Sequence, residues 1–363
     1  MKNFSIYLGL ALTGILLFKI NEGDIVSTMV SVNINPTSFE NTTTQNQIKE
    51  KDPLTVMAFG DVMLGRYVRT LMEKHGKDYI FENLDMLENP FYGEADLVFA
   101  NLEGPIKGEG YRHQTAMVFG FHEDTADFLK KYGFNILSIA NNHALDQKPE
   151  GRDSTIKALD EVGIGWCGDS KNVDPNSVHY GNSGETTYAF ICFNDAISRL
   201  DRDKAIELVR EVSEKVDVSI VSIHWGFEYT HIPHDEIQVK LGRTFVDAGA
   251  DFIIGHHPHV VQNFEKYNGK FIFYSLGNFV FDQYWSKATQ EELGIRISFE
   301  KNGKTLITQV ELFPMKSENS RPRLMDYDEK FEWLERFIKY GNYDEETISS
   351  IRAGVLTTEG KNG

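Results

Sequence analysis

Five short apolar runs, each followed at once by polar residues that can bind metal, constrain the fold of this chain more than any other feature. Strands that are apolar at nearly every position are typical of sheets buried on both faces, so helices must cover both sides. The segments between the runs carry apolar residues at helical spacing, and this alternation predicts an α/β fold. The runs are 54–59, 97–100, 136–140, 218–223 and 251–254, and the helical segments are 124–132, 154–162, 203–215 and 237–248.

The residues that follow these runs indicate where a functional site would form. In open α/β sheets, ligands bind beyond the carboxyl ends of the strands, where residues from separate strands meet. Polar side chains without a shared role need not fall at strand ends, so we interpret their position as the sign of one site. These side chains belong to Asp61, Glu103, Asn142, His143, His224, His257 and His259.

The fifth run leads into three histidines within four residues, in the stretch 255–259. Neutral imidazole is the commonest side-chain metal ligand, and two histidines two positions apart after a strand can face one cation or two. Pro258 stiffens the backbone between His257 and His259. The alternative is that all three are surface loop residues without a function.

Together these side chains offer enough ligands for two divalent cations. Carboxylate and amide oxygens suit hard divalent ions, and imidazole suits manganese, iron and zinc. Pairs of such metals are a common centre for phosphoester hydrolysis. We predict that His143 protonates the leaving oxygen or stabilises the transition state, and that Asp61 is both catalytic and a ligand. The predicted metal ligands are Asp61, Glu103, Asn142, His224, His257 and His259.

The composition is that of a folded but acidic protein. With 363 residues, of which 41% are hydrophobic, the chain can bury a large core. The formal net charge of −17 argues against nucleic acid and anionic membrane surfaces as partners, although metal ions could still hold an anionic substrate. We interpret Cys167 and Cys192, which lie in or beside apolar runs, as buried small hydrophobic residues rather than a disulfide framework.

The amino terminus carries a targeting signal. Lys2 precedes an uncharged run from Phe4 to Phe18, and Lys19 closes it. Fifteen residues suit the core of a signal peptide, but no small-residue cleavage site follows, and a snorkelling lysine can extend the run into a single anchor. We interpret residues 1–20 as an uncleaved membrane anchor with the body outside the cell membrane; a cleaved signal and a secreted body are the alternative.

The rest of the chain predicts one large domain. Residues 21–52 are polar and aperiodic, which indicates a flexible tether. Alternating residues around Asn302-Gly303 predict a hairpin of antiparallel strands, and apolar residues between 331 and 338 have helical spacing. We therefore expect a domain over residues 53–345 and a C-terminal tail over 346–363.

Six motifs in order along residues 54–290 resemble the CapA/PgsA family of capsule-synthesis, poly-γ-glutamate biosynthesis proteins, which are distantly similar to calcineurin-like metallophosphoesterases. The resemblance implies a four-layer α/β/β/α metallophosphoesterase-like sandwich on an N-terminal anchor. The motifs are Gly60-Asp61-Val62-Met63-Leu64-Gly65-Arg66, Ala100-Asn101-Leu102-Glu103-Gly104, Ala140-Asn141-Asn142-His143-Ala144-Leu145-Asp146, His224-Trp225-Gly226-Phe227-Glu228-Tyr229, Gly255-His256-His257-Pro258-His259 and Tyr274-Ser275-Leu276-Gly277-Asn278-Phe279.

The resemblance also implies roles for individual residues. Asp61 matches the first-motif aspartate, Asn142 and His143 match the Gly-Asn-His motif as ligand and catalytic histidine, and His224, His257 and His259 match the later histidine motifs. Two positions depart from the wider phosphoesterase group. Met63 stands where that group has a histidine, and Glu103 replaces its bridging aspartate.

Four further residues are candidates for substrate binding, each with a structural alternative. Arg66 could contact an anionic substrate or form a salt bridge, and Asn101 could bind or shape a turn. Trp225 could be a stacking platform, and Glu228 could line the pocket, or both could serve packing.

These observations leave three hypotheses. The first is a membrane-anchored protein for synthesis or export of an anionic polymer such as poly-γ-glutamate, with a hydrolase- or transferase-type metal site. Its partners would be the polymer or its intermediate and membrane synthase subunits. The second is a general exported metallophosphoesterase, and the third is a non-catalytic scaffold that holds the polymer or the synthase complex.

Overall fold

The computed structural model describes residues 53–361 apart from 89, 108–116 and 197–199. The predicted anchor and tether, residues 1–52, lie outside this part of the chain. Among the described residues, no helix combines the length and apolar character needed to cross a membrane.

The described domain contains two mixed β-sheets. In the first sheet the strand order is β14-β13-β12-β1-β2-β3-β4, with β11 also paired to β1 and β15 to β13. Strands β1 to β4 are parallel, whereas β12 runs antiparallel to β1. The strands are β1 (Leu54–Val62), β2 (Leu97–Leu102), β3 (Ile136–Ser138), β4 (Gly165–Cys167), β11 (Asn278–Val280), β12 (Glu291–Asn302), β13 (Thr305–Glu318), β14 (Arg321–Leu324) and β15 (Val355–Lys361).

The second sheet has the order β5-β6-β7-β8-β10-β9. Its central strands β6, β7, β8 and β10 are parallel, and an antiparallel strand closes each edge. The five apolar runs thus form β1, β2 and β3 in one sheet and β7 and β8 in the other. The strands are β5 (Val178–Ser183), β6 (Thr186–Asn194), β7 (Val218–His224), β8 (Phe252–His256), β9 (Phe264–Tyr267) and β10 (Lys270–Phe273).

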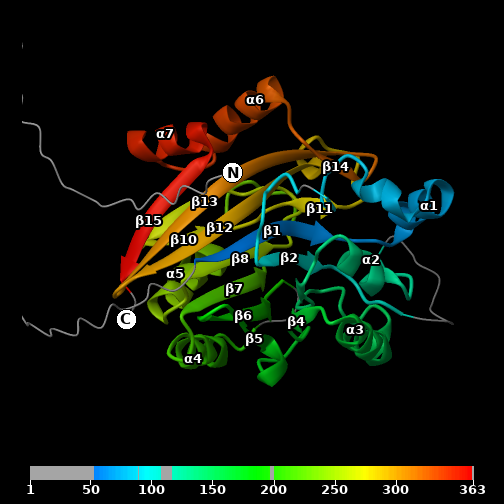
Figure 1. Ribbon diagram of the computed structural model, residues 1–363, viewed down its shortest axis with the longest axis horizontal. Helices are drawn as coiled ribbons and strands as arrows, with labels where there is room; N and C mark the ends of the chain where they lie inside the picture. Colours follow the sequence, from blue (N-terminus) through cyan, green and yellow to red (C-terminus); the bar gives the residue numbers. More distant parts are fainter. Residues whose placement is uncertain (1–52, 89, 108–116, 197–199, 362–363) are drawn as a thin grey trace, which may run out of the picture. The chain divides into compact units, whose positions relative to one another are not determined.

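The two sheets face each other, and helices cover their outer faces (Figure 1). Phe99 of β2 stacks on Phe190 of β6 in the core between the sheets, with ring centroids 4.8 Å apart. Helices α1 to α3 pack on the outer face of the first sheet, and α4 and α5 on that of the second. The arrangement is therefore α/β/β/α, as the sequence predicts.

Helices α2, α4 and α5 lie close to their predicted limits, α3 begins six residues earlier than predicted, and α1 was not predicted. Helices α6 and α7 add to the core between the sheets through residues such as Phe337 and Ile351. The α-helices are α1 (Arg66–His75), α2 (Thr125–Lys131), α3 (Lys148–Val162), α4 (Arg202–Ser213), α5 (Lys240–Asp247), α6 (Tyr327–Ile338) and α7 (Glu345–Ala353). Short 3₁₀ segments are η1 (Lys77–Phe81), η2 (Pro175–Ser177) and η4 (Ala288–Gln290), and η3 (Asp235–Val239) is a π-helical turn.

Two C-terminal features differ from the prediction. The predicted tail forms most of α7 and then β15, which pairs with β13, so it is part of the domain. The predicted hairpin is present, but Asn302 pairs with Thr305, which leaves Gly303 and Lys304 as the turn residues. Gly303 has φ +60°, a conformation that favours glycine and suits the first central position of a hairpin turn.

The interpretation of the cysteines is wrong. Cys167 at the end of β4 and Cys192 in β6 form a disulfide that joins the two sheets. Both residues face the core between the sheets, which explains their apolar surroundings. Their pairing depends on how one sheet packs on the other. A local apolar pattern in the sequence does not indicate this packing.

Candidate metal centre

The carboxyl ends of the first sheet supply oxygen-bearing side chains to the candidate site. Leu97 and Phe99 of β2 face the core between the sheets. Because every second side chain of a strand lies on the same face, Asn101 and Glu103 continue this row. Asp61 lies at the end of the neighbouring strand β1, and a turn after β3 carries Asn142 and His143.

The second sheet supplies imidazoles by the same alternation. Val218 and Ile220 face the inner core, and His224 ends β7 on the same face. His256 ends β8 in register with His224. His257 and His259 follow with φ of +95° and +57°, which is strained backbone for residues with a Cβ. Such strain collects at functional sites, where the surrounding fold maintains it.

Asp61 lies where the oxygen-bearing side chains of the first sheet meet the imidazoles of the second. Its Oδ1 accepts a hydrogen bond from Asn101 Nδ2 at 2.8 Å and lies 3.3 Å from His256 Nδ1. Its Oδ2 accepts a bond from the backbone N–H of His257 at 3.4 Å and lies 3.5 Å from His259 Nδ1. Burial opposes ionisation, but the imidazoles of His256 and His259 and the amide of Asn101 outweigh it and hold the pKa of Asp61 below its usual value.

Glu103 is a buried carboxylate whose two oxygens have no hydrogen-bond partner. Oε1 lies 3.6 Å from His259 Nε2 and 3.9 Å from His143 Nε2. Burial, together with the charges of Asp61 and Glu228, raises the pKa of Glu103 well above its usual value. A buried carboxylate of this kind is costly alone and favourable beside a cation, so Glu103 has the surroundings of a metal ligand.

Burial keeps the imidazoles of His224 and His257 neutral. Burial lowers the pKa of His224 well below its usual value, and neighbouring histidines lower it further. Burial, followed by the charge of His259, lowers the pKa of His257 to about 3. His224 Nε2 lies 2.8 Å from Asn142 Oδ1 and 3.2 Å from His257 Nδ1. Neutral imidazole is the form that binds metal.

The orientation of His259 is fixed by an amide. Its Nδ1 lies 2.9 Å from Asn278 Oδ1, while Asn278 Nδ2 donates to the backbone oxygen of Thr289 at 3.0 Å and to Gln283 Oε1 at 3.1 Å. Because the amide oxygen only accepts, Nδ1 of His259 carries the hydrogen. Nε2 therefore presents a lone pair to the site, an arrangement common for ligating histidines.

The orientation of His143 is fixed by a carboxylate and an aromatic ring. Its Nδ1 lies 2.7 Å from Asp146 Oδ2, and the same oxygen accepts a 2.6 Å bond from the backbone N–H of Phe119. The ring of Phe119 stacks on the imidazole with centroids 3.9 Å apart. Asp146 thus orders the loop after His143 and leaves Nε2 of His143 facing Glu103.

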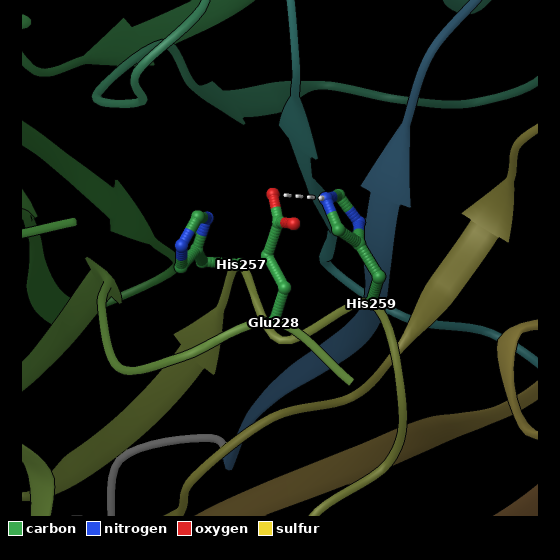
Figure 2. Close-up of side chains that lie close together, drawn as sticks. All are labelled: Glu228, His257 and His259. Atoms are coloured by element: carbon green, nitrogen blue, oxygen red, sulfur yellow. Dashed lines mark ion pairs between the residues drawn. The ribbon is translucent and has the colours of Figure 1, made fainter. Parts of the chain in front are cut away.

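The donor atoms form two groups that could each hold a cation. One group is Asp61, Glu103 and His224, and the other is Glu228, His257 and His259; within each group the donor atoms lie within 4.8 Å of one another. Figure 2 shows the second group, with the Glu228 carboxylate between the two imidazoles. Carboxylate and imidazole together suit manganese, iron or zinc, so the residues present fit divalent metal.

A family comparison agrees with this arrangement. Residues 55–283 match the model of the family described as "Bacterial capsule synthesis protein PGA_cap". The chain belongs to the PGA_cap family. The matched range contains every residue of the two groups.

Two curated capsule or PGA biosynthesis proteins are similar to most of the chain. "Capsule biosynthesis protein CapA" of Bacillus anthracis is 33% identical over 286 residues, which cover 73% of this chain and 68% of that protein. "PGA biosynthesis protein CapA" of Bacillus subtilis (strain 168) is 34% identical over 273 residues, which cover 69% of each chain. A phosphatase structure from Mycoplasma pneumoniae is 13% identical and covers 75% of this chain and 91% of that one, with a TM-score of 0.44, a likeness too weak to carry an argument.

Two predicted substrate-binding residues of this PGA_cap protein have structural contacts instead. Trp225 is fully buried, and its indole donates to the backbone oxygen of Tyr274 at 2.9 Å, so the ring has no free face for a ligand. The stacking platform is therefore not formed, and Trp225 packs behind the site. Asn101 is also fully buried, within β2, where it supports Asp61 rather than a turn or a substrate.

The other two candidates lie closer to solvent. Arg66 forms a salt bridge with Asp282, and its guanidinium lies 5.0 Å from the ring centroid of Phe119 and 5.4 Å from that of Phe281. Arg66 thus forms a salt bridge, which was the alternative to substrate contact. It lies beside Phe119, the ring that stacks on His143. Glu228 has a side chain that is 45% exposed and points to the second donor group.

The sequence prediction gave no role to His256, although it lies in the three-histidine stretch. His256 is buried, and both ring nitrogens lack a hydrogen-bond partner. The alternation of side chains along β8 could have identified His256, because Phe252 and Ile254 face the inner core and His256 is the next residue on that face. Met63 also offers no ligand, because it packs in the outer core of the first sheet with its sulfur 3.1 Å from the backbone N–H of Gly65.

Proposed function

We propose that this PGA_cap protein acts in the synthesis or export of an anionic capsule polymer such as poly-γ-glutamate, through a metal-dependent hydrolase- or transferase-type site. Membership of the family and the names of the two curated relatives support the capsule role. Because the protein is itself acidic, a bound cation would supply the positive charge that holds the polymer or its intermediate.

One observation carries the metal-dependent part of the proposal. Glu103 is fully buried, and neither of its oxygens has a hydrogen-bond partner among the described residues; burial also lowers the pKa of His259, the imidazole 3.6 Å away. Without a cation this arrangement leaves a buried carboxyl group without a hydrogen bond. Desolvation of that kind is costly, and bound metal is a common way to offset it.

Asp61, Glu103, His224, His257 and His259 would hold the metal, with Asn142 and His256 beside them. Bound divalent metal would polarise a phosphoryl or carbonyl oxygen of the substrate and lower the pKa of water. The protein's own contribution is to fix the ligands from two sheets and to exclude water around Asp61 and Glu103.

His143 would deliver the proton that a leaving group needs. Asp146 accepts a hydrogen bond from Nδ1 and so keeps the imidazole in one orientation, with Nε2 directed into the site. Stacking on Phe119 restricts rotation of the ring. A general acid held in this way contributes roughly 10²–10⁴-fold to a rate.

We further propose that residues 1–20 anchor the protein and that its body lies outside the cell membrane, where membrane synthase subunits would be its partners. The uncharged run between Lys2 and Lys19 supports the anchor. The disulfide between Cys167 and Cys192 supports an oxidising compartment, because such bonds persist mainly in exported proteins.

Elemental analysis of the full chain, purified without chelators or a histidine tag, tests the metal-dependent part. We expect one or two equivalents of manganese, iron or zinc in the wild type and a loss of bound metal in the double variant His224→Ala/His257→Ala. Absence of metal from the wild type, even after soaking with each ion, would eliminate the metalloenzyme.

Complementation of a deletion strain separates catalysis from a scaffold role. We expect His143→Ala to restore the protein but not the polymer, because the substitution removes the proposed general acid. Full polymer production by His143→Ala would favour the scaffold. Normal polymer in the deletion strain, with loss of phosphatase activity, would favour a general metallophosphoesterase.

A further inference from the structure

Glu228 lies on a loop that is fastened directly to the histidine turn. The backbone N–H of Trp225 donates to the carbonyl oxygen of His256 at 3.1 Å, and that of Tyr229 donates to the carbonyl oxygen of Pro258 at 2.8 Å. Residues 225–229 therefore run beside residues 256–259, with a hydrogen bond at each end. Glu228 is held over the turn although its side chain is 45% exposed.

Packing around the loop restricts it further. Gly226 has φ +82°, and a Cβ at this position would lie 2.5 Å from Cδ of Gln238. The Gln238 amide donates to Gln262 Oε1 at 2.7 Å, and Gln262 in turn donates to the backbone oxygen of Thr230 at 2.9 Å. The loop is thus fixed on the side away from the site, so the position of Glu228 is set by the fold.

The carboxylate of Glu228 reaches two buried imidazoles. Oε1 lies 4.0 Å from Nε2 of His259, the nitrogen whose lone pair faces the site, and a donor atom of His257 lies within 4.8 Å of both. Figure 2 shows these side chains converging from the two fastened segments. Two imidazoles and one carboxylate form a ligand set that binds zinc, iron and related divalent ions.

A surface role explains Glu228 less well. Within the part of the chain that the structure describes, no lysine or arginine forms an ion pair with it. The nearby imidazoles are buried, and Oε1 of Glu228 and Oε1 of Glu103 lie 4.0 Å and 3.6 Å from the same nitrogen, Nε2 of His259. Two neighbouring carboxylates without a basic partner are mutually repulsive unless a cation lies between them.

We infer that Glu228 is a metal ligand, which completes a site for a second divalent transition-metal ion with His257 and His259. This inference rests on the proposed metal centre and assigns to Glu228 a role other than substrate contact. It also places the second ion on the solvent side, because Glu228 is exposed whereas Asp61, Glu103 and His224 are buried.

Equilibrium dialysis of the full chain against Mn²⁺ tests the inference, with Glu228→Gln, Glu228→Asp and Glu332→Gln beside the wild type. Glu332→Gln is the matched control, since Glu332 is an exposed glutamate on α6. We expect Glu228→Gln to lose one equivalent or to bind it at least about tenfold more weakly. We expect Glu228→Asp to bind at an intermediate level and the control to match the wild type.

The possible outcomes separate this inference from the proposed function. Wild-type binding of two ions by Glu228→Gln, with unchanged affinities, would overturn the assignment of Glu228 and leave the metal centre intact. Absence of Mn²⁺ from every protein, after repetition with Zn²⁺ and Fe²⁺, would overturn both. Thermal melting of metal-free Glu228→Gln should match that of the wild type, which shows that any lost metal does not reflect misfolding.

Discussion

The two sheets contribute different chemistry to one site. The first sheet ends in carboxylates and amides, Asp61, Asn101 and Glu103, whereas the second ends in the imidazoles of His224 and His256, followed by His257 and His259. Neither oxygen of Glu103 has a hydrogen-bond partner among the described residues, and burial lowers the pKa of His224, His257 and His259, which keeps these imidazoles neutral. The buried group Asp61, Glu103 and His224 combines donors from both sheets and so depends on their packing against each other, whereas Glu228, His257 and His259 all follow strands of the second sheet.

Asp61→Asn should have the largest effect, because Asp61 is the point at which the two sheets' donors meet. The variant keeps the shape of the side chain but removes the charge beside His256 and His259. We expect metal affinity to fall by about 100-fold or more, the upper end of losses seen even for residues that only support ligands. Elemental analysis and chelator competition measure this, and near-normal metal content would show that the first sheet is dispensable.

Removal of the disulfide tests whether the sheets need a covalent link. The double variant Cys167→Ala/Cys192→Ala removes the covalent bond between two residues that are 25 positions apart in sequence. Because the bond restricts the unfolded chain, loss of a loop of this size should lower the free energy of unfolding by about 3 kcal/mol. Denaturant unfolding under non-reducing conditions measures it. A stability equal to that of the wild type would mean that core packing alone holds the sheets in place.

Glu103→Gln should separate stability from metal binding. Because the wild-type carboxyl group is buried and unpaired, we expect the metal-free variant to be at least as stable as the wild type. We also expect it to lose most of the stabilisation that Mn²⁺ gives the wild type, about 2.7 kcal/mol at a concentration 100 times the dissociation constant. Melting curves with and without Mn²⁺ check both; an equal metal-induced shift would exclude Glu103 as a ligand.

Glu292 offers a control outside the site. This residue of β12 is also buried, its oxygens have no hydrogen-bond partner, and burial raises its pKa well above the ordinary 4.5. Since the pKa is raised by folding, its contribution to stability is complete below about pH 4.5 and is lost as the pH rises through the folded-state value.

Glu292→Gln should therefore have the smallest effect, a gain of about 1 kcal/mol in the free energy of unfolding at neutral pH. We expect the gain to vanish below pH 4.5 and to be the same with and without Mn²⁺. Denaturant unfolding between pH 4 and 8 measures this dependence. A gain that depended on Mn²⁺ would connect Glu292 to the metal centre.

Much of the site could be predicted because strand ends are local features of the sequence. Asp61, Glu103, His224 and the histidine turn each follow an apolar run, and parallel strands bring such ends together. The role of Trp225 could not be predicted, since its burial depends on Tyr274 of a segment far along the chain. The disulfide and the contribution of β15 depend on sheet packing in the same way.

The uneven exposure of the donors has a consequence for exchange kinetics. Asp61, Glu103, His224, His257 and His259 are all buried, whereas Glu228 is exposed. If each donor group holds an ion, the ion held by Asp61, Glu103 and His224 would be the less accessible of the two to solvent. Two ions in such an order would exchange at different rates, so a chelator should remove one quickly and the other slowly, in a biphasic time course.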